Sequence, residues 1–185
     1  MTKRYWFAAI LAVLPAAGGA DAAVTILGDG YARKCYEAAE FNRAGRAAFT
    51  DCDFALKFDK LSSSERAATH VNRGVLFMQG RDYANAIADY DTALGIDGDL
   101  AEAYVNKGIA VLHRGGSETV AVDLLSRGIA LTPSRPEVAL YARGVAHEKL
   151  GRVREAYDDY RQAAALKPDW AEPAKELTRF KVIEQ

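Results

Sequence analysis

The sequence has 185 residues, of which 50% are hydrophobic, with 24 basic and 25 acidic side chains. A net charge of −1 gives no sign of the strong positive charge that attracts nucleic acid or an anionic membrane, so we expect neither as a partner. The chain is long enough to bury one continuous core.

Residues 1–22 have the three-part layout of a secretory signal peptide. Lys3 and Arg4 give a basic start, residues 6–14 an apolar run, and residues 20–22 a small-x-small cleavage site. The alternative is a membrane anchor, but a spanning helix needs about 20 apolar residues. We therefore expect cleavage after Ala22, a periplasmic or secreted product, and no stable membrane insertion after cleavage.

An extended leader, residues 23–30, is expected next, because Val24–Leu27 is a short β-prone run followed by two glycines. A disordered leader is the alternative. Residues 31–60 then read as a helical hairpin with helices over 32–41 and 46–58, joined by a turn at 42–45.

Cys35 and Cys52 are 17 residues apart, one on each arm of this hairpin. An exported protein favours a disulfide between them, and closing such a loop stabilises by roughly 3 kcal/mol. The alternative is a metal or redox pair. Two cysteines without a clustered histidine are too few for zinc, and a CxxC motif is absent.

Three further helix pairs follow, with a last helix after them. Proline, or an Asp-Gly step, closes the second helix of each pair. The predicted pairs are 65–79 with 82–96, 101–114 with 118–131, and 136–150 with 152–166. A helix over 171–182, within residues 170–185, is expected to cap the array, with Pro173 in its first turn.

The first helix of each pair, and the last helix, is preceded by a capping-box spacing, in which two side chains satisfy orphan amides reciprocally. The strict form has Ser at its first position, as in Ser62 with Glu65 and Ser134 with Glu137, whereas Asp can cap alone. The same spacing recurs, 37, 35 and 35 residues further on, at Asp99 with Glu102, Ser134 with Glu137, and Asp169 with Glu172.

Small residues repeat at a second, independent period. Gly74, Gly108 and Gly144 lie 34 and 36 residues apart. Three further positions follow in phase: Ala86, Ala121 and Ala156; Tyr90, Leu125 and Tyr160; and Ala93, Gly128 and Ala163. A period of this size indicates stacked units, each too small to bury its own apolar face.

These residues resemble the tetratricopeptide repeat (TPR) family, well over residues 65–168 and more weakly over the first hairpin. The resemblance implies an all-α solenoid of antiparallel helix pairs in a right-handed superhelix, with repeats at 65–98, 101–135 and 136–169 and a C-terminal capping helix. The glycines would lie where the two helices of a pair cross. Ala93, Gly128 and Ala163 would face the first helix of the next pair.

The sequence departs from the family pattern just before each glycine, where a basic residue stands. Acidic residues occupy matching places in the second helix of two repeats, so we predict the ion pairs Arg73–Asp89 and Arg143–Asp159. Lys107 is expected to pair less well, because Leu124 occupies that place in the middle repeat. The alternative is that all these charges are solvated and contribute about 0–1 kcal/mol each.

We find no catalytic constellation. His70, His113 and His147 lie at different phases of the repeat, and no nucleophile elbow or phosphate-loop signature occurs. We therefore predict no enzymatic activity, no metal and no cofactor.

The resemblance instead implies a concave groove, lined by the first helix of each pair, that takes a protein or peptide. The residues expected to be exposed there are Asn72, Val75, Met78 and Gln79; Asn106, Ile109, Leu112 and His113; and Tyr141, Val145, Glu148 and Lys149. Asn72 and Asn106 are in phase. In peptide-binding relatives, asparagines near here hold a ligand's main chain or terminal carboxylate; the alternative is a hydrogen bond to a neighbouring helix.

The leading hypothesis is a non-enzymatic, exported scaffold that binds a protein segment in this groove. The second is a structural subunit, or a self-associating component, of a cell-envelope assembly.

Overall fold

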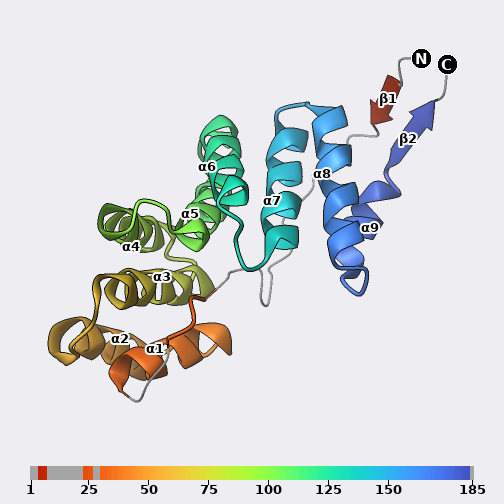
Figure 1. The fold of residues 1–185 in the computed structure, drawn as a ribbon. Helices are drawn as coiled ribbons and strands as arrows, with labels where there is room; N and C mark the ends of the chain where they lie inside the picture. The colour runs from red at the N-terminus through yellow and green to blue at the C-terminus, as the bar shows by residue number, and fades with distance from the viewer. Residues whose placement is uncertain (1–3, 8–22, 27–29, 184–185) are drawn as a thin grey trace.

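The structure is a computed structural model that describes residues 4–7, 23–26 and 30–183 (Figure 1). The predicted signal peptide lies mostly outside the described residues. The helices are α1 (Tyr31–Glu40), α2 (Arg46–Phe58), α3 (Ser63–Gln79), α4 (Tyr83–Ile96), α5 (Ala101–Arg114), α6 (Glu118–Ala130), α7 (Pro136–Lys149), α8 (Val153–Leu166) and α9 (Ala171–Leu177).

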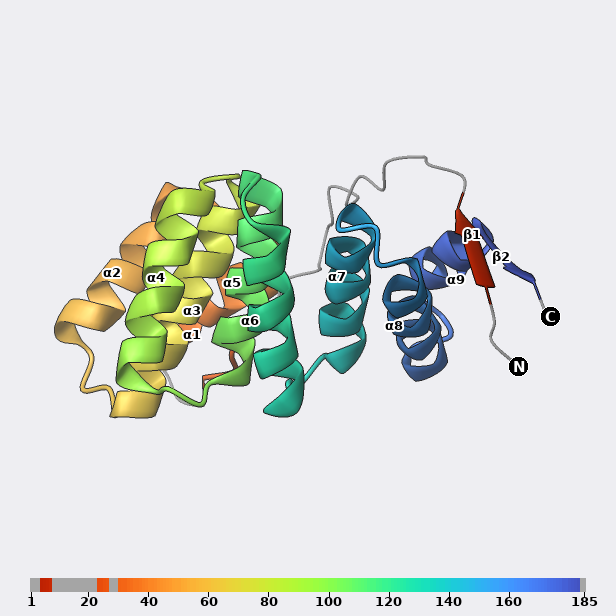
Figure 2. The same ribbon diagram turned by 90° about the horizontal axis from the view of Figure 1, so that it is seen from above.

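The helices form antiparallel pairs that stack in chain order. Figures 1 and 2 show α1 and α2 at one end, then α3 with α4, α5 with α6, α7 with α8, and α9 at the other end. This is the expected all-α solenoid. We call α3, α5 and α7 the A helices and α4, α6 and α8 the B helices.

Each A helix crosses its B helix at the predicted glycine. A Cβ at Gly74 would lie 2.4 Å from Cε1 of Tyr90, one at Gly108 2.7 Å from Cγ of Leu125, and one at Gly144 2.8 Å from Cε1 of Tyr160. Each of these three large partners is fully buried. The crossing therefore has no room for a methyl group, which explains the period of the glycines.

Gly128 contacts a different helix from the one expected. A Cβ there would lie 2.6 Å from Cγ2 of Val105 and 3.2 Å from the carbonyl oxygen of Ala101, both on α5. The expectation that Gly128 faces the next A helix is wrong. In an antiparallel pair, the later turns of the B helix face the earlier turns of its own A helix. Gly128 therefore allows α5 and α6 to pack closely, as Gly108 does.

Helix α3 begins with the predicted capping box. Oγ of Ser62 accepts a hydrogen bond from the amide of Glu65 at 3.3 Å, and the Glu65 carboxylate accepts one from the amide of Ser62 at 2.8 Å. Two B helices also have side-chain caps, since Asp82 accepts from the amide of Asn85 in α4 and Ser117 from that of Val120 in α6.

The other three predicted capping boxes are wrong. Helices α5, α7 and α9 begin after Leu100, Arg135 and Trp170, one residue later than the spacing requires, and have no side-chain cap. Glu102 accepts a hydrogen bond from the amide of Ser134 instead, at 2.9 Å. That contact joins the start of α5 to the loop before α7.

The first hairpin is closed by a disulfide between Cys35 of α1 and Cys52 of α2, with the two Cα atoms 4.8 Å apart. Both cysteines are fully buried and pack against Val75 and Leu76 of α3. The predicted pairing is confirmed, and the packing of the disulfide on α3 joins the first hairpin to the core.

The last helix is shorter than expected. Helix α9 ends at Leu177, and β2 (Phe180–Ile183) follows, paired antiparallel with β1 (Arg4–Phe7). The prediction of helix through Val182 is wrong, because this aromatic and β-branched run favours a strand. Phe180 still covers the last pair, with its ring centroid 6.0 Å from that of Tyr160.

Candidate functional site

The candidate site is the A-helix face, which we define by the residues predicted to line the groove. Eight of them are buried: Asn72, Val75, Met78, Asn106, Ile109, Leu112, Tyr141 and Val145. The expectation that these side chains are open to solvent is corrected by the structure. Gln79, Glu148 and His113 are half-buried, and Lys149 is exposed.

The buried apolar members belong to the core because the first hairpin and the following elements cover them. Val75 packs with the disulfide, whereas Met78, Ile109 and Leu112 lie in the central cluster. Tyr141 packs against Trp170, with ring centroids 4.9 Å apart. The regular spacing of these residues along the A helices therefore reflects packing between neighbouring helix pairs.

Asn72 uses its side-chain amide on the main chain of a distant residue. Its Oδ1 accepts a hydrogen bond from the amide of Val24 at 2.7 Å, and its Nδ2 donates to the carbonyl oxygen of Val24 at 2.9 Å. The sequence predicted a bound peptide or a neighbouring helix as the partner of Asn72, and did not predict Val24. Asn106, in phase on α5, is also fully buried.

Apart from the two asparagines, the polar members of the face lie at the C-terminal ends of the A helices. Nε2 of Gln79 donates to the carbonyl oxygen of Ala39 at 2.8 Å, which ties α3 to α1. His113 stacks on Tyr83, with centroids 5.5 Å apart. Burial lowers the pKa of His113, as do the positive charges of Lys149 and Arg81. The groups that a partner could contact here are therefore the neutral imidazole of His113 and the exposed ammonium of Lys149.

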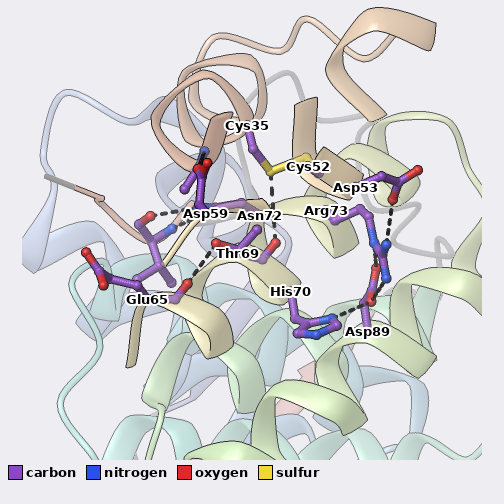
Figure 3. The surroundings of a disulfide bond; sticks show 12 residues. Cys35, Cys52, Asp53, Asp59, Glu65, Thr69, His70, Asn72, Arg73 and Asp89 are labelled. Atoms are coloured by element: carbon purple, nitrogen blue, oxygen red, sulfur yellow. Dashed lines mark hydrogen bonds and ion pairs between the residues drawn. A yellow bond between two sulfur atoms is a disulfide. The ribbon is translucent and has the colours of Figure 1, made fainter. Parts of the chain in front are cut away.

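A partly buried ionic cluster lies beside α3 (Figure 3). The guanidinium of Arg73 donates two hydrogen bonds to Asp89, at 2.8 and 2.7 Å, and a third to Asp53 of α2 at 2.7 Å. Nδ1 of His70 lies 2.9 Å from Oδ1 of Asp89. The predicted pair Arg73–Asp89 is confirmed, and it also binds α2.

The predicted pair Arg143–Asp159 is confirmed as well. Nε and Nη2 of Arg143 donate to Asp159 at 2.9 and 2.8 Å, while Nη1 donates to Oγ of Ser126 on the preceding B helix at 3.1 Å. Lys107 pairs with Asp91, also on the preceding B helix. Each A-helix cation thus links its pair to the one before it, a role that the spacing did not reveal.

The partners of Asp89 keep its carboxylate charged, so we assign it a structural role. Burial alone would raise the pKa of Asp89, but hydrogen bonds from Arg73 and His70, together with their charges, outweigh it and hold the pKa below its usual range. The hydrogen bonds with Asp89 raise the pKa of Arg73. Both groups stay charged and paired at neutral pH.

Among the described residues, no group of three or more His, Cys, Asp or Glu side chains is placed to hold a metal ion. In the part of the chain that the structure describes, none of the helices has both the length and the apolar character that crossing a bilayer requires.

Two stretches of the chain, residues 67–100 and 138–170, match family models described as tetratricopeptide repeat. The human tetratricopeptide repeat protein 13 is 38% identical over 90 residues, which cover 46% of this chain and 10% of that protein. The chain thus spans about a tenth of the length of this curated relative.

Solved structures share the fold. The Arabidopsis OM64 TPR domain is similar with a TM-score of 0.60 and 24% identity, covering 64% of this chain and 96% of that domain. The second TPR domain of human RPAP3, solved in complex with an HSP70 peptide, has a TM-score of 0.57 and 26% identity, covering 63% of this chain and 96% of that one. The helix pairs therefore form a tetratricopeptide-type solenoid.

Proposed function

We propose that this tetratricopeptide-type solenoid is a non-enzymatic, exported scaffold that binds a protein segment on its A-helix face. The observation that carries the proposal is the amide of Asn72, which accepts a hydrogen bond from the N–H of Val24 and donates one to its C=O, as it would to an extended peptide. The similarity to a peptide-bound TPR domain of human RPAP3 supports the same mode.

Export is part of the proposal. The N-terminal layout favours cleavage after Ala22, and the disulfide between Cys35 and Cys52 suits an oxidising compartment. We expect the protein recovered from the periplasm of a bacterial host to begin at Ala23 and to contain the disulfide. Mass spectrometry of the intact protein, with and without reduction, tests both points; a retained Met1 would contradict export.

Site-specific photo-crosslinking tests which face binds. A photoreactive amino acid replaces His113 or Lys149 on the A-helix face, and Thr92 on the exposed side of α4 serves as the matched control. We expect adducts with the same partner from positions 113 and 149 and none from position 92. Adducts from position 92 alone would place the partner on the B-helix side and contradict the proposal.

A second function, self-association in an envelope assembly, is favoured by one surface. Phe41, Phe54 and Phe58 in the first hairpin are 62%, 39% and 59% exposed, and Phe54 contacts both Tyr31 and Phe58 edge to face. Exposed aromatic patches mark interaction surfaces. Light scattering distinguishes this function: an oligomer that becomes monomeric in Phe54→Glu/Phe58→Glu supports it, and a monomeric wild type rejects it.

A further inference from the structure

Residues 23–26, which we call the leader, lie against Asn72 of the A-helix face. Both hydrogen bonds of the Asn72 amide go to one residue, Val24, which is 48 positions earlier in the chain. Asn72 is itself fully buried. An amide that satisfies the N–H and the C=O of the same residue recognises an extended main chain and is indifferent to its side chain.

The side chains of the leader supply the apolar contacts. Val24 is half-buried, Thr25 is exposed, and Ile26 is 4% exposed, which is the alternation of an extended strand. Ile26 packs with Ala32 of α1, Ala55 of α2 and Ala68 of α3. Val24 contacts the same cluster and also the central core. The leader therefore lies where the first hairpin meets the first repeat.

The buried side chains of the receiving surface are small, and the partly buried Tyr31, Tyr36 and Leu61 pack against them. Ala32, Ala55 and Ala68 are each 4% exposed or less, and none of them fills the place that Ile26 takes. A surface of alanines beside one amide has little shape of its own until a larger side chain covers it. This favours β-branched residues at alternate positions, as in Val24-Thr25-Ile26.

We propose that residues 23–26 are a tethered, displaceable ligand of the A-helix face, and that its external partner is an extended peptide of the same chemistry. Such a peptide has a free N–H and C=O at one residue, with β-branched apolar side chains at that residue and two positions later. The inference rests on the proposed function. It adds that the partner must first displace the leader.

Competition of this kind has a measurable consequence. A segment joined to its own site acts at an effective concentration in the millimolar range, so it fills the site in most molecules. The apparent affinity for an external peptide then falls in proportion to the fraction of molecules whose site is open. Weakening the leader alone should strengthen peptide binding.

The experiment uses the exported chain, which begins at Ala23, and a fluorescent peptide with blocked ends, Ala-Ala-Val-Thr-Ile-Leu-Gly, which copies residues 22–28. Val24→Pro removes the N–H that Asn72 accepts, and Ile26→Asp removes the apolar anchor. Anisotropy should show that each variant binds the peptide about tenfold more tightly than wild type, or better. Thr25→Ala, at the exposed leader position, is the matched control and should equal wild type.

A second substitution shows whether Asn72 is the site. In the Val24→Pro background, Asn72→Asp keeps the size of the side chain but loses the Nδ2 donor and should abolish the gain. Melting curves establish that each variant is folded. Hydrogen exchange at the Val24 amide gives an independent readout, because that amide should be protected in wild type and exposed in Ile26→Asp.

Two results would overturn the inference: equal peptide binding by wild type and by folded Val24→Pro, or a gain that survives Asn72→Asp. Either leaves the proposed function standing if positions 113 and 149 still crosslink a partner. Loss of those crosslinks, with peptide binding as expected, would instead reject the proposed function and keep the self-occupied site.

Discussion

At the scale of single residues, the stack depends on a glycine in each A helix that faces one large side chain of the B helix. Tyr90 lies over Gly74 and Tyr160 over Gly144, and both rings are fully buried. The tyrosine ring takes the volume that a side chain on the A helix would otherwise fill. Close packing of this kind tolerates little added volume.

Gly74→Ala should therefore destabilise the protein, even though alanine is the better helix former. Its Cβ would lie 2.4 Å from the Tyr90 ring, and overpacking of a core typically costs about 1–3 kcal/mol. Gly95→Ala is the matched control in α4, with no atom within 4 Å of the new Cβ, and it should stabilise by roughly 0.5–1 kcal/mol. Urea unfolding measures both; equal effects would contradict the crossing geometry.

Asp89 is expected to govern part of the acid stability. Its folded pKa lies below the unfolded value of about 4, so the unfolded chain binds more protons as the pH falls. The stabilisation is full above that unfolded pKa and is lost as the pH falls through the folded one. Asp89→Asn should lose about 3 kcal/mol of unfolding free energy at pH 7, because the largely buried Arg73 then keeps only the exposed Asp53 as a charged partner.

The same variant should lose less further stability than wild type as the pH falls from 5 to 2. Urea midpoints at several pH values test this difference. Asp123→Asn, which removes an exposed carboxylate from α6, controls for the change in net charge. Parallel curves for Asp89→Asn and wild type would show that the Arg73–Asp89 pair does not contribute.

At the scale of elements, the first hairpin is the part that most needs a covalent link. Helices α1 and α2 lack a glycine crossing like that of the repeats, and their buried residues are small: Ala32, Cys35, Ala39, Ala48, Cys52 and Ala55. Little apolar area is buried by such side chains. The disulfide replaces the packing that a tyrosine supplies in the first and third repeats.

Replacing both cysteines by serine should lower the free energy of unfolding by about 3 kcal/mol. The loss should be local, because stacked repeats contact mainly their neighbours. Hydrogen exchange should rise over residues 31–58 and remain slow over 101–149. A uniform rise along the chain would mean that the hairpin and the repeats unfold as one unit.

At the scale of the whole molecule, the two ends of the stack are closed in different ways. The C-terminal end is covered by Trp170 and Phe180 and by Arg179, whose guanidinium pairs with Glu148. Tyr160 donates a hydrogen bond to the same carboxylate at 3.0 Å. Burial, and then the nearby negative charge of Glu148, raises the pKa of Tyr160. This end is a compact polar and aromatic cap.

A chain that ends at Pro168 should lose this cap and expose the rings of Tyr141 and Tyr160. We expect a lower melting temperature, faster hydrogen exchange in α7 and α8, and self-association detected by light scattering. Glu172→Ala, in the half-buried first turn of α9, is the milder control. A truncated chain that stays monomeric with unchanged α8 exchange would show that the cap is dispensable.

The stack also curves enough for distant elements to meet. Nη2 of Arg135, just before α7, lies 3.0 Å from Oε1 of Glu40 at the end of α1. These residues are 95 positions apart, and both side chains are partly buried. No repeat spacing predicts such a contact, because it depends on the rotation accumulated over several pairs.

The sequence by itself determined the helix pairs, the glycine crossings, the disulfide and the ion pairs Arg73–Asp89 and Arg143–Asp159. These depend on spacing within one pair, where helical periodicity fixes which side chains meet. Only the tertiary structure decided that Lys107 pairs backward with Asp91, that Val75 and Tyr141 are core, and that Val24 lies on Asn72. Those contacts join separate pairs, and the rotation between successive pairs is set by packing that no period in the sequence records.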